Sequence, residues 1–239
     1  MAIFTIADLH LSLSVPKPMD VFGSRWQNYT DRLERGWRAV VSEGDTVIVP
    51  GDISWAMRLS EADEDFRFID RLPGRKLIGK GNHDYWWETV TKMRRHLDLI
   101  GVRSVEFLHG NAMTVENYIV CGTRGWFVEE RLQSTECDFE RLRRRETLRL
   151  EAALESAAAL RETDEGRDHP ILVFLHFPPA FGGAVSVGLA DAMKRYGVAH
   201  CYYGHIHGRY DIPPVEEVCG VPCSIVSSDY LDFVPKIIK

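Results

Sequence analysis

Short apolar runs alternate with amphipathic stretches along the first hundred residues of the chain. The apolar runs have the length and β-forming composition of buried strands, and they lie at 2–7, 46–49 and 76–78. The stretches that separate and follow them have apolar residues at helical spacing. We expect helices from about 31 to 44, over 61–71 and over 86–97. This alternation predicts parallel strands joined by right-handed crossovers.

The second half of the chain has a different pattern. Residues 103–122 contain turn sequences at His109-Gly110-Asn111 and at Glu116-Asn117, which are typical of antiparallel hairpins. The remaining expected elements are a long helix over 134–163, a strand at 171–175, a short helix at 188–196, a strand at 199–203 and further strands that fill 209–234. We find no repeat or linker, and we therefore expect a single domain over residues 1–239.

The composition narrows the class of protein. Hydrophobic residues make up 45% of the 239 residues and charged residues 27%, as in ordinary soluble proteins. The net charge of −6 does not favour long nucleic acid as a partner. The apolar N-terminal run is interrupted by Asp8 and His10, and no uninterrupted apolar run reaches the length of a membrane span.

The cysteines also bear on the environment of the protein. There are five of them, an odd number, and no pair has the C-x-x-C spacing. Cys121 and Cys201 lie within apolar runs. Free buried thiols in a reducing compartment are therefore the better interpretation, and we expect a cytoplasmic protein.

Polar residues with metal-binding side chains directly follow five of the expected strands. They are Asp8, His10, Asp52, Asn82, His83, Asp84, His176, His205 and His207. Ligands gather at the carboxyl ends of strands in open α/β sheets, so these residues are expected to converge. Each has a simpler explanation alone: a turn or capping Asp or Asn, or a core histidine. Their joint occurrence at five strand ends favours a metal site.

The mixture of side chains indicates which ions would bind. Imidazoles together with carboxylate and amide oxygens, without thiolates, suit Mn²⁺, Fe or Zn²⁺. Seven candidate ligands (Asp8, His10, Asp52, Asn82, His176, His205 and His207) are too many for one tetrahedral site. The set is suitable for two divalent ions that share a bridging carboxylate.

The order of these motifs resembles that of the calcineurin-like metallophosphoesterase family. The matching elements are Asp8-x-His10, Gly51-Asp52, Gly81-Asn82-His83-Asp84, His176 and Gly204-His205-x-His207. The resemblance implies an α/β fold, a β-sandwich of two mixed sheets flanked by helices in four layers. It implies that Asp8, His10 and His207 bind one metal and that Asn82, His176 and His205 bind the other. Asp52 would bridge the two.

The resemblance also implies catalytic residues and a reaction. His83 would act on the phosphate without binding metal, and Asp84 would orient its ring. Many relatives have a further acidic residue three positions after the Gly-Asp aspartate, where this chain has Trp55. The implied reaction is hydrolysis of a phosphoester by a hydroxide that bridges the metals. A small phosphomonoester or phosphodiester such as a nucleotide is the expected substrate.

Two other functions stay open on the sequence, namely a nuclease and a non-catalytic metal-binding scaffold with the same fold. Arg58, Arg124 and Trp126 are candidates for contact with substrate, although a surface or core role explains each of them as well. The segment 12–30, with Pro16, Pro18, Trp26 and Tyr29, could wall the site or be a packed loop. The oligomeric state is left open.

Overall fold

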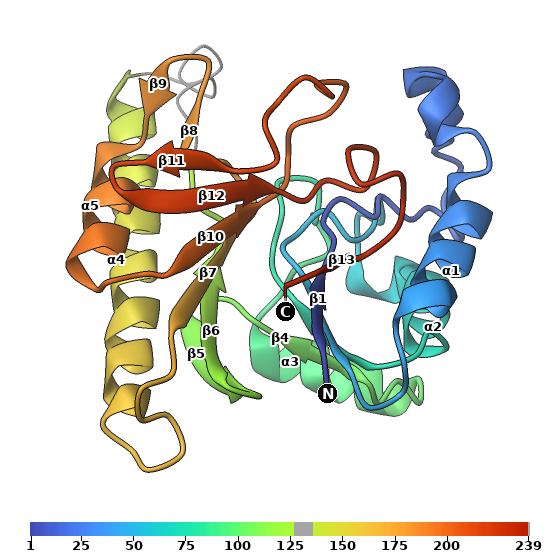
Figure 1. Cartoon of the computed structure of the whole chain (residues 1–239). Coiled ribbons are helices and arrows are strands. Elements are labelled where there is room, and N and C mark those ends of the chain that lie inside the picture. The colour runs from blue at the N-terminus through green and yellow to red at the C-terminus, as the bar shows by residue number, and fades with distance from the viewer. Residues whose placement is uncertain (127–135, 239) are drawn as a thin grey trace.

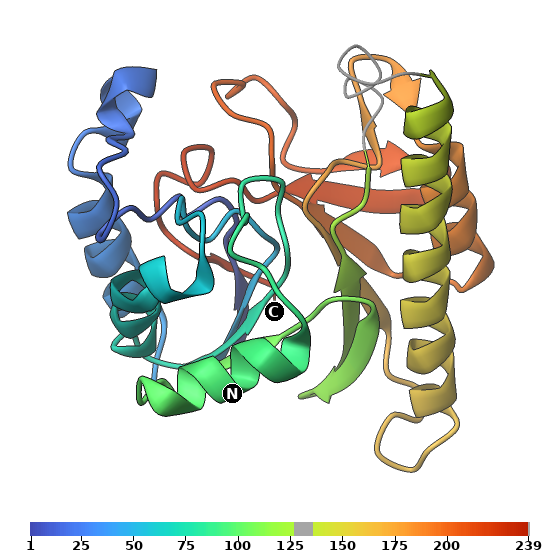
Figure 2. The ribbon, with the colours of Figure 1, turned by 180° about the vertical axis from the view of Figure 1, so that it is seen from behind.

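The computed structural model describes residues 1–126 and 136–238. Two β-sheets pack face to face, and helices cover the outer face of each (Figure 1). The helices are α1 (Tyr29–Val40), α2 (Asp63–Asp70), α3 (Val90–Leu99), α4 (Glu136–Arg161) and α5 (Val187–Arg195). Three of them lie against the first sheet, and α4 and α5 lie against the second (Figures 1 and 2). The four-layer sandwich expected from the sequence is confirmed.

The first sheet has the strand order β13-β1-β2-β3-β4. Its strands are β1 (Ile3–Thr5), β2 (Thr46–Val49), β3 (Arg75–Ile78), β4 (Val105–Phe107) and β13 (Lys236–Ile237). The strands β1 to β4 are parallel, and only β13 is antiparallel to its neighbour. The parallel pairing predicted for the first three strands is therefore confirmed.

The second sheet has the order β11-β12-β10-β7-β6-β5. Its strands are β5 (Asn111–Val115), β6 (Tyr118–Thr123), β7 (Ile171–Leu175), β10 (His200–Tyr203), β11 (Glu216–Val218) and β12 (Val221–Ile225). The four central strands are parallel, and β5 and β11 at the two edges are antiparallel to their neighbours. A separate small hairpin pairs β8 (Ala180–Phe181) with β9 (Ala184–Val185).

Three clusters of buried side chains hold these layers together. Ile48 and Leu77 of the first sheet pack against Leu172 and Phe174 of the second, which forms the core between the sheets. A second cluster joins the first sheet to α1, α2 and α3, and a third joins the second sheet to α4 and α5. Both faces of each sheet are thus buried, which explains why the central strands are continuous apolar runs.

The structure corrects three expectations about these elements. The sequence around His109 does not close a hairpin, because it carries the chain from β4 in the first sheet to β5 in the second. The turn at Glu116-Asn117 does join the antiparallel pair β5 and β6. The first helix ends at Val40 rather than near Gly44, and Val40 is exposed. Residues 228–233 form turns instead of strand.

The cysteine and membrane predictions have different outcomes. Cys121, Cys201 and Cys223 are buried free thiols, as expected, whereas Cys219 is exposed. No described helix is both long and apolar enough to cross a membrane. The cytoplasmic location and the single domain stay predictions, and residues 134–135 of the expected long helix lie outside the described residues.

Candidate metal centre

The carboxyl ends of strands from both sheets meet at one place in the molecule. The loop after β1 is joined to the end of β12, because the amide of Ala7 donates to the carbonyl of Val226 at 2.7 Å. The same loop is joined to the segment after β2, where the amide of His10 donates to the carbonyl of Asp52 at 2.9 Å. Residues that follow β1, β2, β3, β7 and β10 are thereby brought together, as the position of polar residues after the strands predicts.

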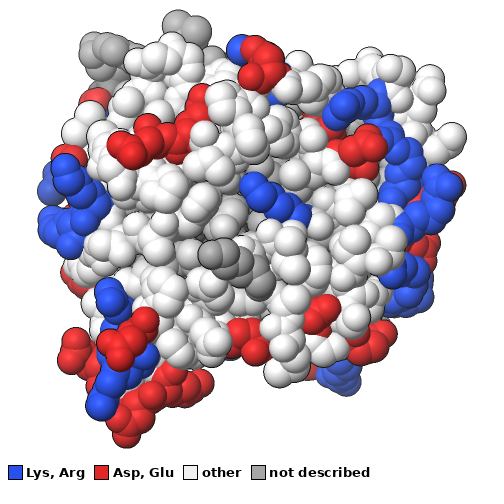
Figure 3. All heavy atoms as spheres, in the orientation of Figure 1, with Lys and Arg blue, Asp and Glu red and all other residues white. Residues whose placement is uncertain are grey.

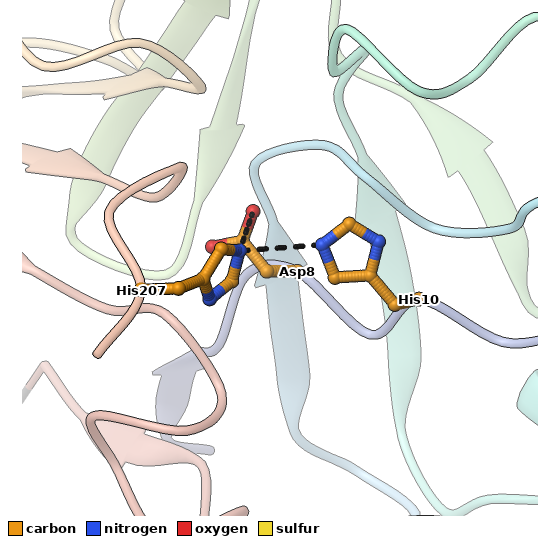
Figure 4. Close-up of side chains that lie close together, drawn as sticks. All are labelled: Asp8, His10 and His207. Atoms are coloured by element: carbon orange, nitrogen blue, oxygen red, sulfur yellow. Dashed lines mark hydrogen bonds and ion pairs between the residues drawn. The ribbon is translucent and has the colours of Figure 1, made fainter. Parts of the chain in front are cut away.

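The first group of side chains consists of Asp8, His10 and His207 (Figure 4). The Nε2 atoms of His10 and His207 lie 3.3 Å apart, and the Nε2 atom of His207 lies 3.9 Å from an oxygen of Asp8. Asp8 and His10 come from the loop after β1, and His207 comes from the loop after β10. Two imidazole nitrogens and a carboxylate oxygen therefore face one point from opposite sheets.

The second group gathers around Asn82. Its Oδ1 atom lies 2.6 Å from Nε2 of His176 and 3.1 Å from Nδ1 of His205. Asp52 lies between the two groups, because its Oδ2 atom is 3.6 Å from Nε2 of His10 and 3.5 Å from Nε2 of His176. Asp8 also borders the second group, at 3.6 Å from Nδ1 of His176. All seven candidate ligands thus lie in two adjoining groups around one carboxylate.

The backbone is strained where these side chains originate. Asp8, His10, Asp52 and His205 all have positive φ angles, of 61°, 45°, 52° and 71°. Such angles are uncommon for residues other than glycine and cost free energy, so they persist only when surrounding contacts enforce them. Four of the seven candidate ligands share this feature, which is typical of residues held in place for a function.

Two glycines of the motifs allow the segments to approach each other closely. A Cβ atom at Gly81 would lie 2.0 Å from Oδ1 of Asp52. A Cβ atom at Gly204 would lie 2.6 Å from both the Cβ of Ala7 and an oxygen of Asp8. No side chain fits at these distances, so glycine is required by the packing of the candidate ligands.

Burial governs the protonation of the centre. It raises the pKa of Asp8 to about 6, and it raises that of Asp52 well above the usual value together with the negative charges of Asp84 and Asp8. Burial lowers the pKa of His10 and of His176 far below the usual value, with neighbouring imidazoles adding to the effect. The pKa of His205 falls to about 3 for the same reasons. These three histidines therefore present neutral imidazole nitrogens beside buried carboxyl groups.

His207 differs from the other imidazoles because of Asp229. Its Nδ1 atom lies 2.8 Å from Oδ1 of Asp229, whose carboxylate also accepts from the amide of Gly208 and the hydroxyl of Tyr210. Burial alone would lower the pKa of His207, but the hydrogen bond to Asp229 and the charge of Asp8 raise it overall. The contact fixes the ring so that its Nε2 atom faces the centre.

Asp229 was missed by the sequence analysis. It follows β12, in the turn Ser227-Ser228-Asp229, and so obeys the same rule as the other site residues. The expectation that strands extend through 209–234 concealed this sixth strand end. The signal was the change from the apolar run 221–226 to three consecutive polar residues.

The structure corrects the role expected for Asp84. Its carboxylate accepts hydrogen bonds from the amides of Gly81, Asp52, Ile53 and Ser54 and from the indole of Trp86, at 2.7–3.3 Å. The ring of His83 is not among these partners, and its Nδ1 atom has no hydrogen-bond partner within the described part of the chain. Asp84 therefore joins the loop after β3 to the loop after β2 and makes no hydrogen bond to the His83 ring.

His83 lies beside the first group and against Trp55. Its ring centre is 4.3 Å from that of Trp55 and 5.6 Å from that of His10, and its amide donates to Oδ1 of Asp52 at 2.8 Å. Burial lowers the pKa of His83 to about 4, with contributions from the charges of Lys17 and His207. The ring is close to the candidate metal ligands without belonging to either group.

The segment 12–30 forms a wall of the site, which is the first of the two interpretations left open by the sequence. Trp26 lies edge-on to both His10 and His207, at ring distances of 5.8 and 5.5 Å. The hydroxyl of Tyr29 donates to the carbonyl of His10 at 2.7 Å. The segment thus packs directly on one group of candidate ligands.

The three candidates for substrate contact have different environments. Arg58 is exposed, and its backbone amide donates a hydrogen bond to the carboxylate of Glu61. The guanidinium of Arg124 lies 3.7 Å from the buried carboxylate of Glu146 and 4.9 Å from the ring centre of Trp126. The carbonyl of Arg124 accepts from the amide of His176, so this residue neighbours the second group. Contact of any of them with substrate stays a prediction.

The residues present fit divalent cations. Asp8 and Asp52 are almost fully buried, and their ion-pair partners among the described residues are histidines. Burying two carboxylates without a cation is costly, and a divalent ion would offset that cost. The donor set of imidazole, carboxylate and amide matches Mn²⁺, Fe and Zn²⁺.

The chain belongs to the calcineurin-like phosphoesterase family, whose family model matches residues 1–209. A comparison with curated proteins found no match. The family supports a metal-dependent phosphoester hydrolase in general. Two sets of side chains in the described residues are close enough together to hold a metal ion, namely Asp8, His10 and His207, and Asp8, Asp52 and His176.

Solved structures with a similar fold share little sequence with this chain. One is the protein of unknown function AQ665 from Aquifex aeolicus, with 13% identity, a TM-score of 0.52 and coverage of 99% of this chain and 95% of that one. Another is the phosphopantetheinyl hydrolase PptH from Mycobacterium tuberculosis, with 16% identity and a TM-score of 0.52. The match covers 95% of this chain and 88% of that one. The protein TT1561 of Thermus thermophilus has 11% identity and a TM-score of 0.53, and the match covers 98% of this chain and 96% of that one. These likenesses establish the fold.

Proposed function

We propose that this protein is a dinuclear metal-dependent hydrolase that cleaves a small phosphomonoester or phosphodiester. The observation that carries the proposal is the position of Asp52. One of its oxygens lies at nearly equal distance from an imidazole of each group, 3.6 Å from His10 and 3.5 Å from His176. A buried carboxylate between two ligand sets is what a bridging ligand requires.

The residues divide between two ions as follows. Asp8, His10 and His207 would hold one, Asn82, His176 and His205 would hold the other, and Asp52 would contact both. Bound divalent ions of this kind acidify water and neutralise the oxygens of a phosphoryl group. Mn²⁺, Fe and Zn²⁺ all suit these ligands, and we propose Mn²⁺ as the first ion to test.

The other residues of the centre position groups and handle protons. In hydrolysis, a water oxygen forms a bond to phosphorus, the bond from phosphorus to the leaving oxygen breaks, and that oxygen takes up a proton. A ring N–H of His83 donates a hydrogen bond that stabilises the charge developing on the leaving oxygen, which contributes a factor of about 10²–10³ in rate. The proton that the leaving oxygen takes up is the one that the attacking water releases. Asp84 holds the loop of His83 and Asn82 against that of Asp52.

Small substrates are favoured over long nucleic acid. Basic and acidic side chains are interspersed in small groups on the face shown in Figure 3, and the net charge is −6. A protein that follows a nucleic acid backbone needs a continuous basic surface. A nuclease is therefore the weaker proposal.

The test is hydrolysis of aryl phosphomonoesters and phosphodiesters with and without Mn²⁺, measured for the wild type, His83→Ala and Asp52→Asn. We expect turnover that requires metal, a loss of about 10²–10³-fold in His83→Ala with metal still bound, and loss of both activity and metal in Asp52→Asn. His96→Ala is the matched control, because His96 pairs with Asp63 away from the centre.

Three results would contradict the proposal or one of the roles in it. Turnover that persists after complete removal of metal would exclude metal-dependent hydrolysis. Metal binding without turnover of any ester would instead favour a non-catalytic scaffold. Loss of metal in His83→Ala would show that this residue is a ligand.

A further inference from the structure

A cavity of about 260 Å³ opens beside the first group of candidate ligands. His10, His83 and His207 form one side of it. The rest of the lining comes mainly from large apolar side chains, namely Met19, Phe22, Trp26, Trp55 and Tyr210. A polar, metal-binding wall and an aromatic wall therefore face the same space.

The inner part of the aromatic wall is held rigidly. Trp55 stacks on His10, with ring centres 4.9 Å apart and planes 24° apart, and its indole N–H points to the sulfur of Met19 at 3.1 Å. Trp26 is fixed edge-on against Tyr29 and Phe233, at ring distances of 5.4 and 5.2 Å. These contacts define the cavity before any ligand binds, which lowers the cost of ordering on binding.

The rim of the cavity is apolar but open to water. Phe22 is 62% exposed and Tyr210 is 45% exposed. These exposed aromatic side chains beside a polar centre would gain burial if a ligand covered them. Stacking against an aromatic ligand adds further stabilisation.

Positive charges flank the same rim. The ammonium of Lys17 lies 3.5 Å from the ring centre of Trp55, and the guanidinium of Arg25 lies 4.0 Å from that of Tyr210. An anionic ligand with an aromatic part complements this combination.

We propose that this cavity binds the leaving group of the substrate and that the leaving group carries a planar aromatic ring. The inference rests on the proposed phosphoesterase function and names the class of ester. With the phosphoryl group at the metal centre, its leaving oxygen faces His83, and the group attached to that oxygen extends into the space between Trp55, Trp26 and Phe22. Aryl esters and esters of nucleosides share this chemistry.

The test is calorimetric binding of phosphonates, which are not hydrolysed, to the Mn²⁺-loaded protein. We expect phenylphosphonate to bind at least about tenfold more tightly than methylphosphonate, since burial of one ring is worth more than about 1.4 kcal/mol. In Phe22→Ala this preference falls at least about threefold. Val21→Ala is the matched control, because Val21 is exposed on the same short helix and does not line the cavity.

The outcomes separate the two proposals. Equal affinities for the two phosphonates, no binding of either, or a preference that is the same in Phe22→Ala would overturn the aromatic pocket. Absence of ester turnover would instead contradict the hydrolase, since binding of phosphonates needs no turnover. A methylene analogue of adenosine monophosphate identifies the source of the ring: tighter binding than phenylphosphonate supports a nucleoside ester, and weaker binding supports an aryl ester.

Discussion

Asp229 holds the imidazole of His207 by a contact of 2.8 Å between its Oδ1 atom and Nδ1 of the ring. The two residues lie on different strand ends of the second sheet, after β12 and β10. Carboxylates that accept from the distal nitrogen of a metal-binding histidine fix its tautomer and raise its basicity as a ligand. Asp229 is therefore expected to act on the metal through His207.

The first prediction concerns Asp229→Asn. Removal of the charge should weaken Mn²⁺ binding by about 10–100-fold, as for other partners of this kind, without unfolding the protein. Titration of the metal-free protein with Mn²⁺ measures the change. Asp211→Asn is the control, because Asp211 pairs with Arg209 at the surface. Unchanged Mn²⁺ affinity in Asp229→Asn would show that the contact only stabilises the fold.

The sequence predicts the centre better than it predicts some of the surrounding elements. The residues after β1, β2, β3, β7 and β10 could be found because strand and ligand are adjacent in the chain, so that a local pattern marks each one. Asp229 was not found, because strand was expected to continue through its turn. The ends of a helix such as α1 are set by packing and capping, which the periodicity of Leu33 and Trp37 does not reveal.

The partners of Asp84 could not be predicted for a different reason. Most of its hydrogen bonds come from backbone amides at residues 52–54, about thirty positions away in the chain. Backbone amides are the same in every sequence, so nothing in the residues themselves indicates such a contact. The order of strands in the second sheet is similarly hidden, since β6 and β7 pair although Ile119 and its partner Ile171 are far apart in the chain.

The second prediction is that Asp84→Asn destabilises the metal-free protein. An asparagine has one acceptor oxygen where the carboxylate has two, and its amide would face the N–H groups of Gly81 and Asp52. Leaving these buried donors without partners should lower the free energy of unfolding by about 2–3 kcal/mol. Urea denaturation measures this change.

A matched control separates this effect from the loss of any acidic residue. Asp98→Asn removes an exposed carboxylate that pairs with Arg103, and the free energy of unfolding should change by less than about 0.5 kcal/mol. If Asp84→Asn kept its stability but lost turnover, this result would support the role first expected for Asp84, which is to orient the ring of His83.

The third prediction is that Gly204→Ala disturbs the first group of ligands. The added methyl group would lie 2.6 Å from an oxygen of Asp8, so that Asp8 must move. We expect the free energy of unfolding to fall by about 1–3 kcal/mol and the affinity for Mn²⁺ to fall with it. Gly44→Ala is the control, because a methyl group there meets only Met1 at 3.5 Å. Equal Mn²⁺ affinity in the two variants would contradict the prediction.

The fourth prediction concerns Lys76, a fully buried lysine of β3. Its ammonium group donates to the carbonyl of Leu72 and to the hydroxyl of Ser104, but burial lowers its pKa to about 8, against the opposing charges of Asp70 and Glu43. Between about pH 8 and the ordinary value of 10.5, the unfolded chain therefore holds a proton that the folded protein has released. Since stability rises with pH wherever the unfolded state binds more protons, this lysine destabilises the fold less as the pH increases.

Comparison with Lys76→Met isolates this contribution, because the other titrating groups are common to both proteins. The free energy of unfolding of the wild type, minus that of Lys76→Met, should be constant below about pH 7 and increase between about pH 8 and 10. Lost hydrogen bonds to Leu72 and Ser104 shift the whole curve without changing its slope. Denaturant unfolding at a series of pH values measures the difference, and a curve that is flat or falls with pH would mean that Lys76 keeps its proton in the folded protein.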